Sequence, residues 1–258
     1  MPHQSRRHTA WAFVTAALVA FALSGVVAQE PAAPQGRPGG GFAGRGGPPQ
    51  PATVPFENPR NAARHQGFLE VARKGDIDLL FVGDSITDGW RNRGLEVWNQ
   101  HFAPLEAANF GIGGDTTQGV LWRMQNGELE GFQAKLIVLM LGTNNISRNP
   151  NADIAEGDRL IVGEFRKRQP QAKVLVLGIF PRAVEASDPR RASIREINGM
   201  LAKLADGTQV FYMDIGDRFL TPDGTLTAEI MPDALHPSAE GYRIWAEAIA
   251  DRVKALMR

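Results

Sequence analysis

The chain contains no cysteine, and its 28 basic residues are matched by 28 acidic residues among 258 positions. The lack of cysteine excludes disulfide bonds, a thiol nucleophile and zinc sites built from thiolates. The balanced charge leaves no basic surplus of the kind that binds nucleic acid or an anionic membrane surface. We therefore expect the partner to be a small molecule, and we expect no nucleic-acid partner.

Several motifs of nucleotide and metal chemistry are also missing. The sequence has no G-x-x-x-x-G-K-[ST] phosphate loop and no H-E-x-x-H zinc motif. The run from Gly111 to Thr116 approaches a dinucleotide-binding fingerprint, but Thr116 stands in place of the third glycine. Ser85 is followed two residues later by Thr87, so it lacks the G-x-S-x-G elbow of α/β-hydrolases.

The first 28 residues have the pattern of a signal peptide. Arg6 and Arg7 precede an uncharged apolar run over residues 10–27, and Val26-Val27-Ala28 is typical of a cleavage site. We expect cleavage after Ala28 and export to the periplasm or the medium, which leaves a mature chain of net charge −2. An uncleaved anchor is the alternative, because the run approaches the ~20 residues that span a bilayer. No later segment is long enough to span a membrane, so we expect no stable transmembrane span after cleavage.

A linker and one domain are expected to follow. Residues 29–55 hold seven glycines and seven prolines among 27 positions, a composition that predicts a disordered linker. From residue 56 to 258, apolar strand patterns at 77–82, 106–110, 135–141, 173–180 and 210–215 alternate with helical patterns. Ile194, Ile197, Leu201 and Leu204 share one helical face, as do Tyr242, Trp245, Ile249 and Val253, and Ser238 could cap the last helix. This alternation predicts an α/β domain with a parallel sheet covered on both faces.

Polar or glycine-rich segments follow four of the predicted strands. Ser85 follows the first strand, and the others lie at 111–115, 142–145 and 233–236. Because ligands bind at the carboxyl ends of parallel strands, these segments should gather at one edge of the sheet. Such a set suits ester hydrolysis, which needs a serine activated by a histidine, a carboxylate that orients the histidine, and donors for the oxyanion.

These blocks resemble the SGNH hydrolases, also called GDSL esterases. The resemblance rests on Gly83-Asp84-Ser85, Gly114, Asn144 and the spacing of Asp233 and His236, and it extends from about residue 77 to the C-terminus. The runs at 109–117, 120–123, 126–130 and 168–173 are further similar to the catalytic subunits of intracellular platelet-activating-factor acetylhydrolase.

The resemblance implies a three-layer α/β/α sandwich of the flavodoxin type, with about five parallel strands and no metal or cofactor. It implies Ser85 as nucleophile, His236 as base and Asp233 as its orienting acid. The backbone N–H groups of Ser85 and Gly114 and the side chain of Asn144 would form the oxyanion hole. Matching positions Ile86, Thr143 and Leu235 would line a small acyl pocket, which predicts short acyl groups on a glycan or lipid. The likeness also makes a homodimer conceivable beside a monomer.

Alternatives remain open at this point. The same fold could serve a lysophospholipase or lipase with longer acyl chains, an acyltransferase, or a glycan-binding protein without turnover. Among single residues, Asn145 rivals Asn144 as oxyanion donor, and His65 and His101 are expected to be surface or structural histidines. We expect Asp84 and Asp115 to make structural hydrogen bonds and Trp90 to pack. Arg91, Arg93 and Arg182 are expected to be solvated charges.

Overall fold

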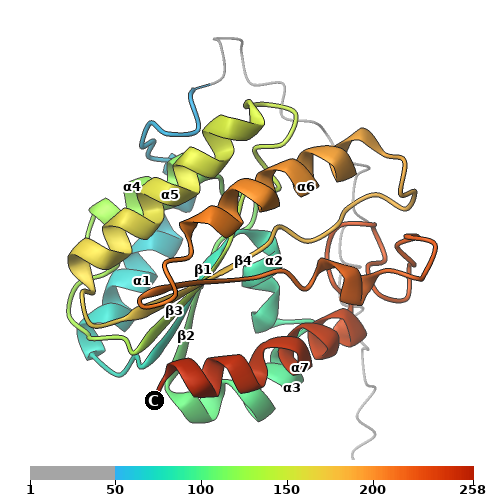
Figure 1. Ribbon diagram of the computed structural model, residues 1–258. Coiled ribbons are helices and arrows are strands. Elements are labelled where there is room, and N and C mark those ends of the chain that lie inside the picture. The colour runs from blue at the N-terminus through green and yellow to red at the C-terminus, as the bar shows by residue number, and fades with distance from the viewer. Residues whose placement is uncertain (1–49) are drawn as a thin grey trace, which may run out of the picture. The chain divides into compact units, whose positions relative to one another are not determined.

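The computed structural model describes residues 50–258 (Figure 1). The predicted signal peptide and residues 29–49 of the predicted linker lie outside the described residues. The strands are β1 (Leu79–Gly83), β2 (Ala107–Gly111), β3 (Leu136–Met140), β4 (Lys173–Leu177) and β5 (Val210–Met213). The α-helices are α1 (Ala62–Lys74), α2 (Ser85–Asp88), α3 (Leu95–His101), α4 (Thr117–Gln125), α5 (Asn151–Arg168), α6 (Pro189–Leu201) and α7 (Ala239–Leu256). Short 3-10 turns are η1 (Pro59–Asn61), η2 (Gly89–Arg91), η3 (Ala103–Leu105), η4 (Ala202–Leu204) and η5 (Gly216–Phe219).

The five strands form one parallel sheet in the order β2-β1-β3-β4-β5. This order confirms the predicted flavodoxin-like α/β/α fold. Gly83 at the end of β1 pairs in register with Gly111 of β2 and Met140 of β3. The carboxyl ends of the three strands are therefore level, and the chain order reverses between β1 and β3. In open α/β sheets, ligands bind at such a switch point.

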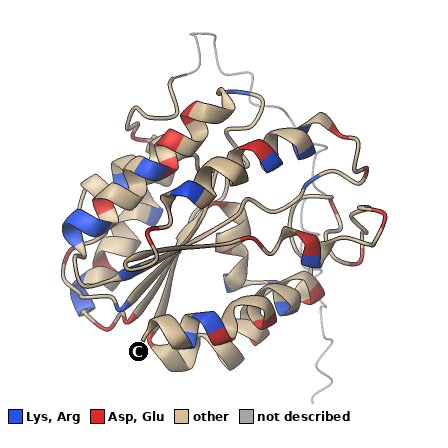
Figure 2. Ribbon diagram, in the orientation of Figure 1, with Lys and Arg blue, Asp and Glu red and all other residues tan. Residues whose placement is uncertain are grey.

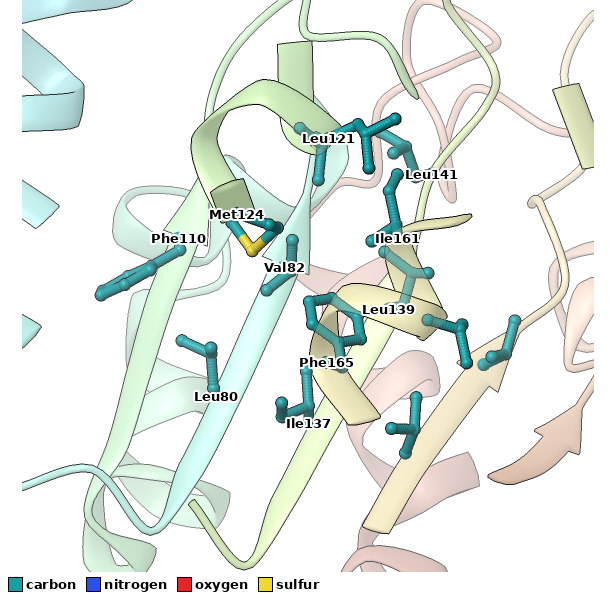
Figure 3. Close-up of a cluster of buried hydrophobic side chains, with 14 of the residues drawn as sticks. Leu80, Val82, Phe110, Leu121, Met124, Ile137, Leu139, Leu141, Ile161 and Phe165 are labelled. Carbon is teal, nitrogen blue, oxygen red and sulfur yellow. The ribbon is translucent and has the colours of Figure 1, made fainter. Parts of the chain in front are cut away.

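The central strands β1 and β3 contain no polar side chain, because both faces of the sheet are covered. In β1, Leu80 and Val82 join one buried cluster while Leu79 and Phe81 join the other. Figure 3 shows the first cluster, in which side chains of β1 and β3 meet those of α4 and α5. A strand buried on both faces has no polar alternation, which explains why the sequence reads as continuous apolar runs.

Helices α4, α5 and α6 cover one face of the sheet, and α3 and α7 cover the other (Figure 1). The predicted face of α6 is buried at Ile194, Ile197 and Leu201, whereas Leu204 falls in η4 and is only partly buried. The predicted apolar face of α7 is entirely buried. The Ser238 hydroxyl accepts the Gly241 N–H at 3.1 Å, which confirms the predicted cap.

Aromatic rings fill the core beneath α7. The ring of Trp90 lies 4.8 Å from that of Trp245 and 4.5 Å from that of Tyr242. Trp90 is 1% exposed, so the expectation that it packs is confirmed. This cluster links α7 to the segment that follows the first strand.

Residues 50–55, which composition placed in the linker, pack against α4. Ala52 is fully buried, and its carbonyl accepts the Thr117 hydroxyl at 2.8 Å. The carbonyl of Gln50 accepts the Gln118 side-chain amide at 2.9 Å. These residues therefore belong to the packed domain, because their backbone carbonyls accept hydrogen bonds from side chains of α4. Such tertiary contacts cannot be predicted from composition.

Surface charges of both signs alternate along the outer helices (Figure 2). Many of them pair within one helix, such as Arg159 with Glu156 at 2.6 Å and Arg243 with Glu247 at 2.6 Å. Exposed pairs of this kind contribute little to stability. Within residues 50–258, no helix is long and apolar enough to cross a membrane.

Candidate active site

Ser85 is the first residue of α2, immediately beyond the end of β1. The Asp84 carboxylate accepts the Ile86 N–H at 2.9 Å and caps this short helix. A Cβ on Gly83 would lie 2.2 Å from Thr87 Oγ1 and 2.5 Å from the Met140 carbonyl. Only glycine fits there, so the Gly-Asp-Ser sequence is required by the tight turn that presents Ser85.

Contacts from distant elements hold α2 in place. The Tyr242 hydroxyl of α7 donates to the Ile86 carbonyl at 2.6 Å, and the Asn109 side chain of β2 donates to the Thr87 carbonyl at 2.9 Å. The sequence motifs did not indicate either contact, because each joins residues that only the tertiary fold brings together. They fix the backbone on which Ser85 sits.

Ser85, His236 and Asp233 form a continuous hydrogen-bonded chain. Ser85 Oγ lies 2.9 Å from His236 Nε2, and His236 Nδ1 lies 2.7 Å from Asp233 Oδ2. Ser85 and His236 are 151 residues apart in sequence. The structure thus brings together the three residues that the sequence predicted as nucleophile, base and orienting acid.

Asp233 is held as a carboxylate by its surroundings. Its Oδ1 accepts the backbone N–H groups of His236 at 2.7 Å and Leu235 at 3.2 Å. Burial raises the pKa of Asp233, but hydrogen bonds from the His236 side chain and backbone outweigh burial and keep the pKa below its usual value. An ionised carboxylate accepts the Nδ1 proton, which leaves Nε2 able to accept the proton of Ser85.

Gly114 lies in the turn that follows β2, and Asn144 lies in the loop that follows β3. Gly114 has a φ of +76° and is exposed, and the turn is closed by the Asp115 N–H, which donates to the Ile112 carbonyl at 3.2 Å. Asn144 Nδ2 donates to the Asp115 carbonyl at 2.8 Å. An amide nitrogen has two hydrogens, so Asn144 keeps one for another acceptor.

Asn145 has a different environment from its neighbour. It is fully buried, its Oδ1 accepts the Thr117 N–H at 3.1 Å, and its Nδ2 donates to Gln118 Oε1 at 2.8 Å. These bonds use the Asn145 side chain to join the loop after β3 to α4. Of the two rivals, Asn144 is the one with a hydrogen available for a substrate.

The residues predicted to line an acyl pocket lie in α2, in the loop after β3 and in the segment before α7. Ile86 and Thr143 are each 1% exposed, and Leu235 is partly buried. Arg182 Nη1 donates to the Thr143 carbonyl at 3.1 Å and to its hydroxyl at 3.3 Å. These contacts fix the orientation of the Thr143 side chain.

The expectation of solvated charge was wrong for two of the three arginines. Arg182 is half-buried on Thr143, and Arg91 donates to the carbonyls of Asn109 and Gly111. Arg91 follows α2, and Arg182 follows β4, so both lie at the functional edge of the sheet. Burial lowers the pKa of both guanidinium groups.

Two buried carboxyl groups lie beneath this edge. Asp84 is fully buried, and burial raises its pKa to about 7. Asp158 of α5 is 1% exposed, and neither of its oxygens has a hydrogen-bond partner within residues 50–258. Burial, and then the charge of Asp84, raises the pKa of Asp158 well above its usual value. Sequence analysis missed Asp158, although its position between Ile154 and Ile161 on the apolar face of α5 was a usable signal.

His65 is structural, as expected. It is 6% exposed, and its Nδ1 lies 2.7 Å from Glu128 Oε1. The structural hydrogen bonds expected for Asp84 and Asp115 are also present, since Asp115 accepts Arg123 Nε at 2.9 Å.

The fold and the site together define a hydrolase of the flavodoxin-like α/β type, with a serine, histidine and aspartate at the switch point of its sheet. Comparisons with known proteins agree. Residues 81–244 match the GDSL-like lipase/acylhydrolase family. The chain therefore belongs to this family, and it is a carboxylic ester hydrolase.

Particular relatives refine the comparison. The alpha2 subunit of platelet-activating factor acetylhydrolase IB from Rattus norvegicus is 39% identical over 203 residues, which cover 76% of this chain and 87% of that protein. A GDSL-like lipase from Bacteroides thetaiotaomicron has a similar fold, with a TM-score of 0.57, 18% identity, and coverage of 76% of this chain and 96% of that chain. A catalytic mutant of an acetylxylan esterase from Geobacillus stearothermophilus gives a TM-score of 0.56, 19% identity, and coverage of 69% and 94%.

Proposed function

We propose that the protein is an exported serine esterase that hydrolyses short-chain carboxylic esters, chiefly acetyl esters, through an acyl-enzyme on Ser85. The observation that carries this proposal is the hydrogen-bonded chain from Ser85 through His236 to Asp233, with spacings of 2.9 and 2.7 Å. This geometry lets a neutral imidazole take the serine proton during attack.

The reaction follows from the site. Ser85 Oγ forms a bond to the ester carbonyl carbon while its proton moves to His236 Nε2 and the carbonyl π electrons move to oxygen. The N–H groups of Ser85 and Gly114 and the second hydrogen of Asn144 Nδ2 receive that oxyanion. The tetrahedral intermediate collapses, and His236 gives its proton to the departing alkoxide oxygen. Water then repeats the sequence on the acyl-enzyme and releases the acid.

A short acyl group is supported by the burial of Ile86, which follows the nucleophile in the chain, and of Thr143. Arg182 fixes Thr143, so this wall cannot easily move aside for a longer chain. The names of the relatives point the same way, since the rat subunit is an acetylhydrolase and the Geobacillus protein an acetylxylan esterase.

A polar groove supports a carbohydrate as the leaving group. The groove has a volume of about 680 Å³ and lies between the loop after β3, two residues beyond Asn144, and the start of α6. It is lined by Ser147, Asn149, Asn151, Ser193 and others, with Asp188 and Arg190 paired at 2.6 Å. Hydroxyl and amide groups around a neutralised ion pair suit a neutral sugar better than an acyl chain.

A chain-length profile tests the proposal. Residues 29–258 would be assayed on p-nitrophenyl acetate, butyrate, octanoate and palmitate, with Ser85→Ala subtracted as background. The proposal predicts a maximum at acetate, followed by release of acetate from acetylated xylan. A maximum at octanoate or beyond would replace the acetylesterase with a lipase. Activity retained in Ser85→Ala would reject the mechanism.

Export is a separate part of the proposal and rests on residues 1–28 of the sequence. Expression of the whole chain in a bacterial host should yield a periplasmic or secreted protein that begins at Gln29. N-terminal sequencing of the purified protein checks this. A product that retains Met1 in the cytoplasm would contradict it.

A further inference from the structure

A buried ionic network lies behind the turn that carries Gly114. Arg123 of α4 is 2% exposed, and its Nε donates to Asp115 Oδ2 at 2.9 Å. Its two terminal nitrogens donate to the Glu128 carboxylate and to the Phe110 carbonyl. Glu128 is fully buried and is also bound by His65 at 2.7 Å. One guanidinium thus joins α4, the end of β2 and the turn after it.

This network connects to the oxyanion donors through one residue. The Asp115 carboxylate is bound by Arg123, and the Asp115 carbonyl accepts Asn144 Nδ2 at 2.8 Å. Gly114 immediately precedes Asp115, and a Cβ on Gly119 would lie 2.0 Å from Asp115 Oδ1, so α4 encloses that carboxylate closely. The position of Arg123 therefore fixes the position of the atom to which Asn144 is anchored.

Stability alone is a poor explanation for these buried charges. Replacing a buried ion network by apolar side chains of similar volume is often neutral or stabilising, because desolvation costs as much as the ion pairs contribute. The arginine's planar fork, in contrast, holds several acceptors in fixed directions, which lysine cannot do. The geometry is that of a positioning device.

We propose that Arg123 is a positioning residue that holds Asn144 in the oxyanion hole through Asp115. The proposal rests on the function proposed above. It also accounts for the sequence run over 120–130, which contains Arg123 and Glu128 and which the catalytic residues leave unexplained.

The kinetic prediction separates positioning from stability. Arg123→Lys keeps the charge but loses the fork, and we expect kcat on p-nitrophenyl acetate to fall about tenfold or more while KM changes little. Gln169→Leu is the matched control. Gln169 is 4% exposed and makes three buried hydrogen bonds, to Leu129, Phe132 and Ala134, at the amino end of the strands. It should lower the melting temperature without lowering kcat.

A double-mutant cycle tests the route through Asn144. If Arg123 acts on Asn144, adding Arg123→Lys to Asn144→Ala should lower kcat by much less than it does in the wild type. Equal losses in both backgrounds would overturn the proposal. Glu128→Gln, which weakens the hold on Arg123, gives the same test if Arg123→Lys does not fold.

An NMR measurement keeps this proposal distinct from the esterase proposal. The side-chain amide signals of Asn144, identified by their loss in Asn144→Ala, should shift and broaden in Arg123→Lys but stay in place in Gln169→Leu. Unchanged signals in Arg123→Lys would refute the positioning role whatever the activity. Shifted signals in a protein that cleaves no ester would uphold the positioning role and reject the esterase.

Discussion

Asp158 should make the stability of the protein fall as pH rises. Its carboxyl group is 1% exposed, has no hydrogen-bond partner within the described residues, and has a pKa well above the usual 3.8. Above the usual value, the folded protein therefore holds this proton more tightly than the unfolded chain does. Unfolding that releases a proton becomes easier at higher pH.

The magnitude follows from proton linkage. Between the unfolded value and the raised folded value, one released proton lowers the free energy of unfolding by about 1.4 kcal/mol per pH unit. Asp158→Asn removes the proton but keeps the shape. Relative to the wild type, the variant should gain stability as pH rises above the usual value of the carboxyl group, by up to about 1.4 kcal/mol per pH unit. Asp84, with its pKa of about 7, adds to the raised pKa of Asp158, so the difference between the two proteins includes this coupling.

Urea denaturation at pH 5, 6, 7 and 8 measures this difference directly. Asp251→Asn, at an exposed position on α7, is the control and should run parallel to the wild type. Parallel curves for wild type and Asp158→Asn would refute the conclusion that Asp158 is protonated in the folded protein. If the free energy of unfolding of the wild type rose with pH relative to that of the variant, the pKa of Asp158 would be lowered by folding, which would contradict the prediction.

Three further changes test other parts of the structure. Asp233→Asn should lower kcat by about 10⁴-fold, because an amide no longer fixes the imidazole tautomer; a loss below tenfold in a pre-steady-state assay would contradict this. Gly83→Ala should destabilise by about 2 kcal/mol or more, because the added Cβ would meet Thr87 Oγ1 at 2.2 Å; an unchanged melting temperature would show that the turn relaxes at no cost. Tyr242→Phe leaves the Ile86 carbonyl without its partner and should cost about 1–3 kcal/mol in denaturant unfolding while kcat stays within a few fold; a large kcat loss at full stability would give Tyr242 a role beyond support.

The α/β fold could be predicted from the sequence because a strand that is buried on both faces of the sheet appears as a continuous apolar run. Every predicted strand region overlaps an observed strand, and the polar residues at the strand ends met at one edge because parallel strands end together. The choice of Ser85, Asp233 and His236 needed the family resemblance in addition, since a serine after a strand is common.

Other features depend on contacts that no local pattern encodes. The sequence predicted Arg182 to be a solvated surface charge, but in the structure it follows β4 and donates a hydrogen bond to the Thr143 carbonyl. Residues 50–55 have a linker's composition, yet Ala52 is buried because α4 offers a hydroxyl to its carbonyl. For Asp158, the sequence shows a polar residue on the apolar face of α5, but it does not show that the side chain is buried without a hydrogen-bond partner among the described residues.

The central claim is that Ser85 forms the acyl-enzyme, and covalent labelling tests it most directly. The protein would be inactivated with diethyl p-nitrophenyl phosphate while esterase activity is followed, then digested and analysed by mass spectrometry. We predict one phosphoryl group per chain, on the peptide that contains Ser85, with labelling proportional to lost activity and absent in Ser85→Ala. Complete inactivation with the label on another residue, or full labelling of Ser85 with activity retained, would contradict the assignment of Ser85 as nucleophile.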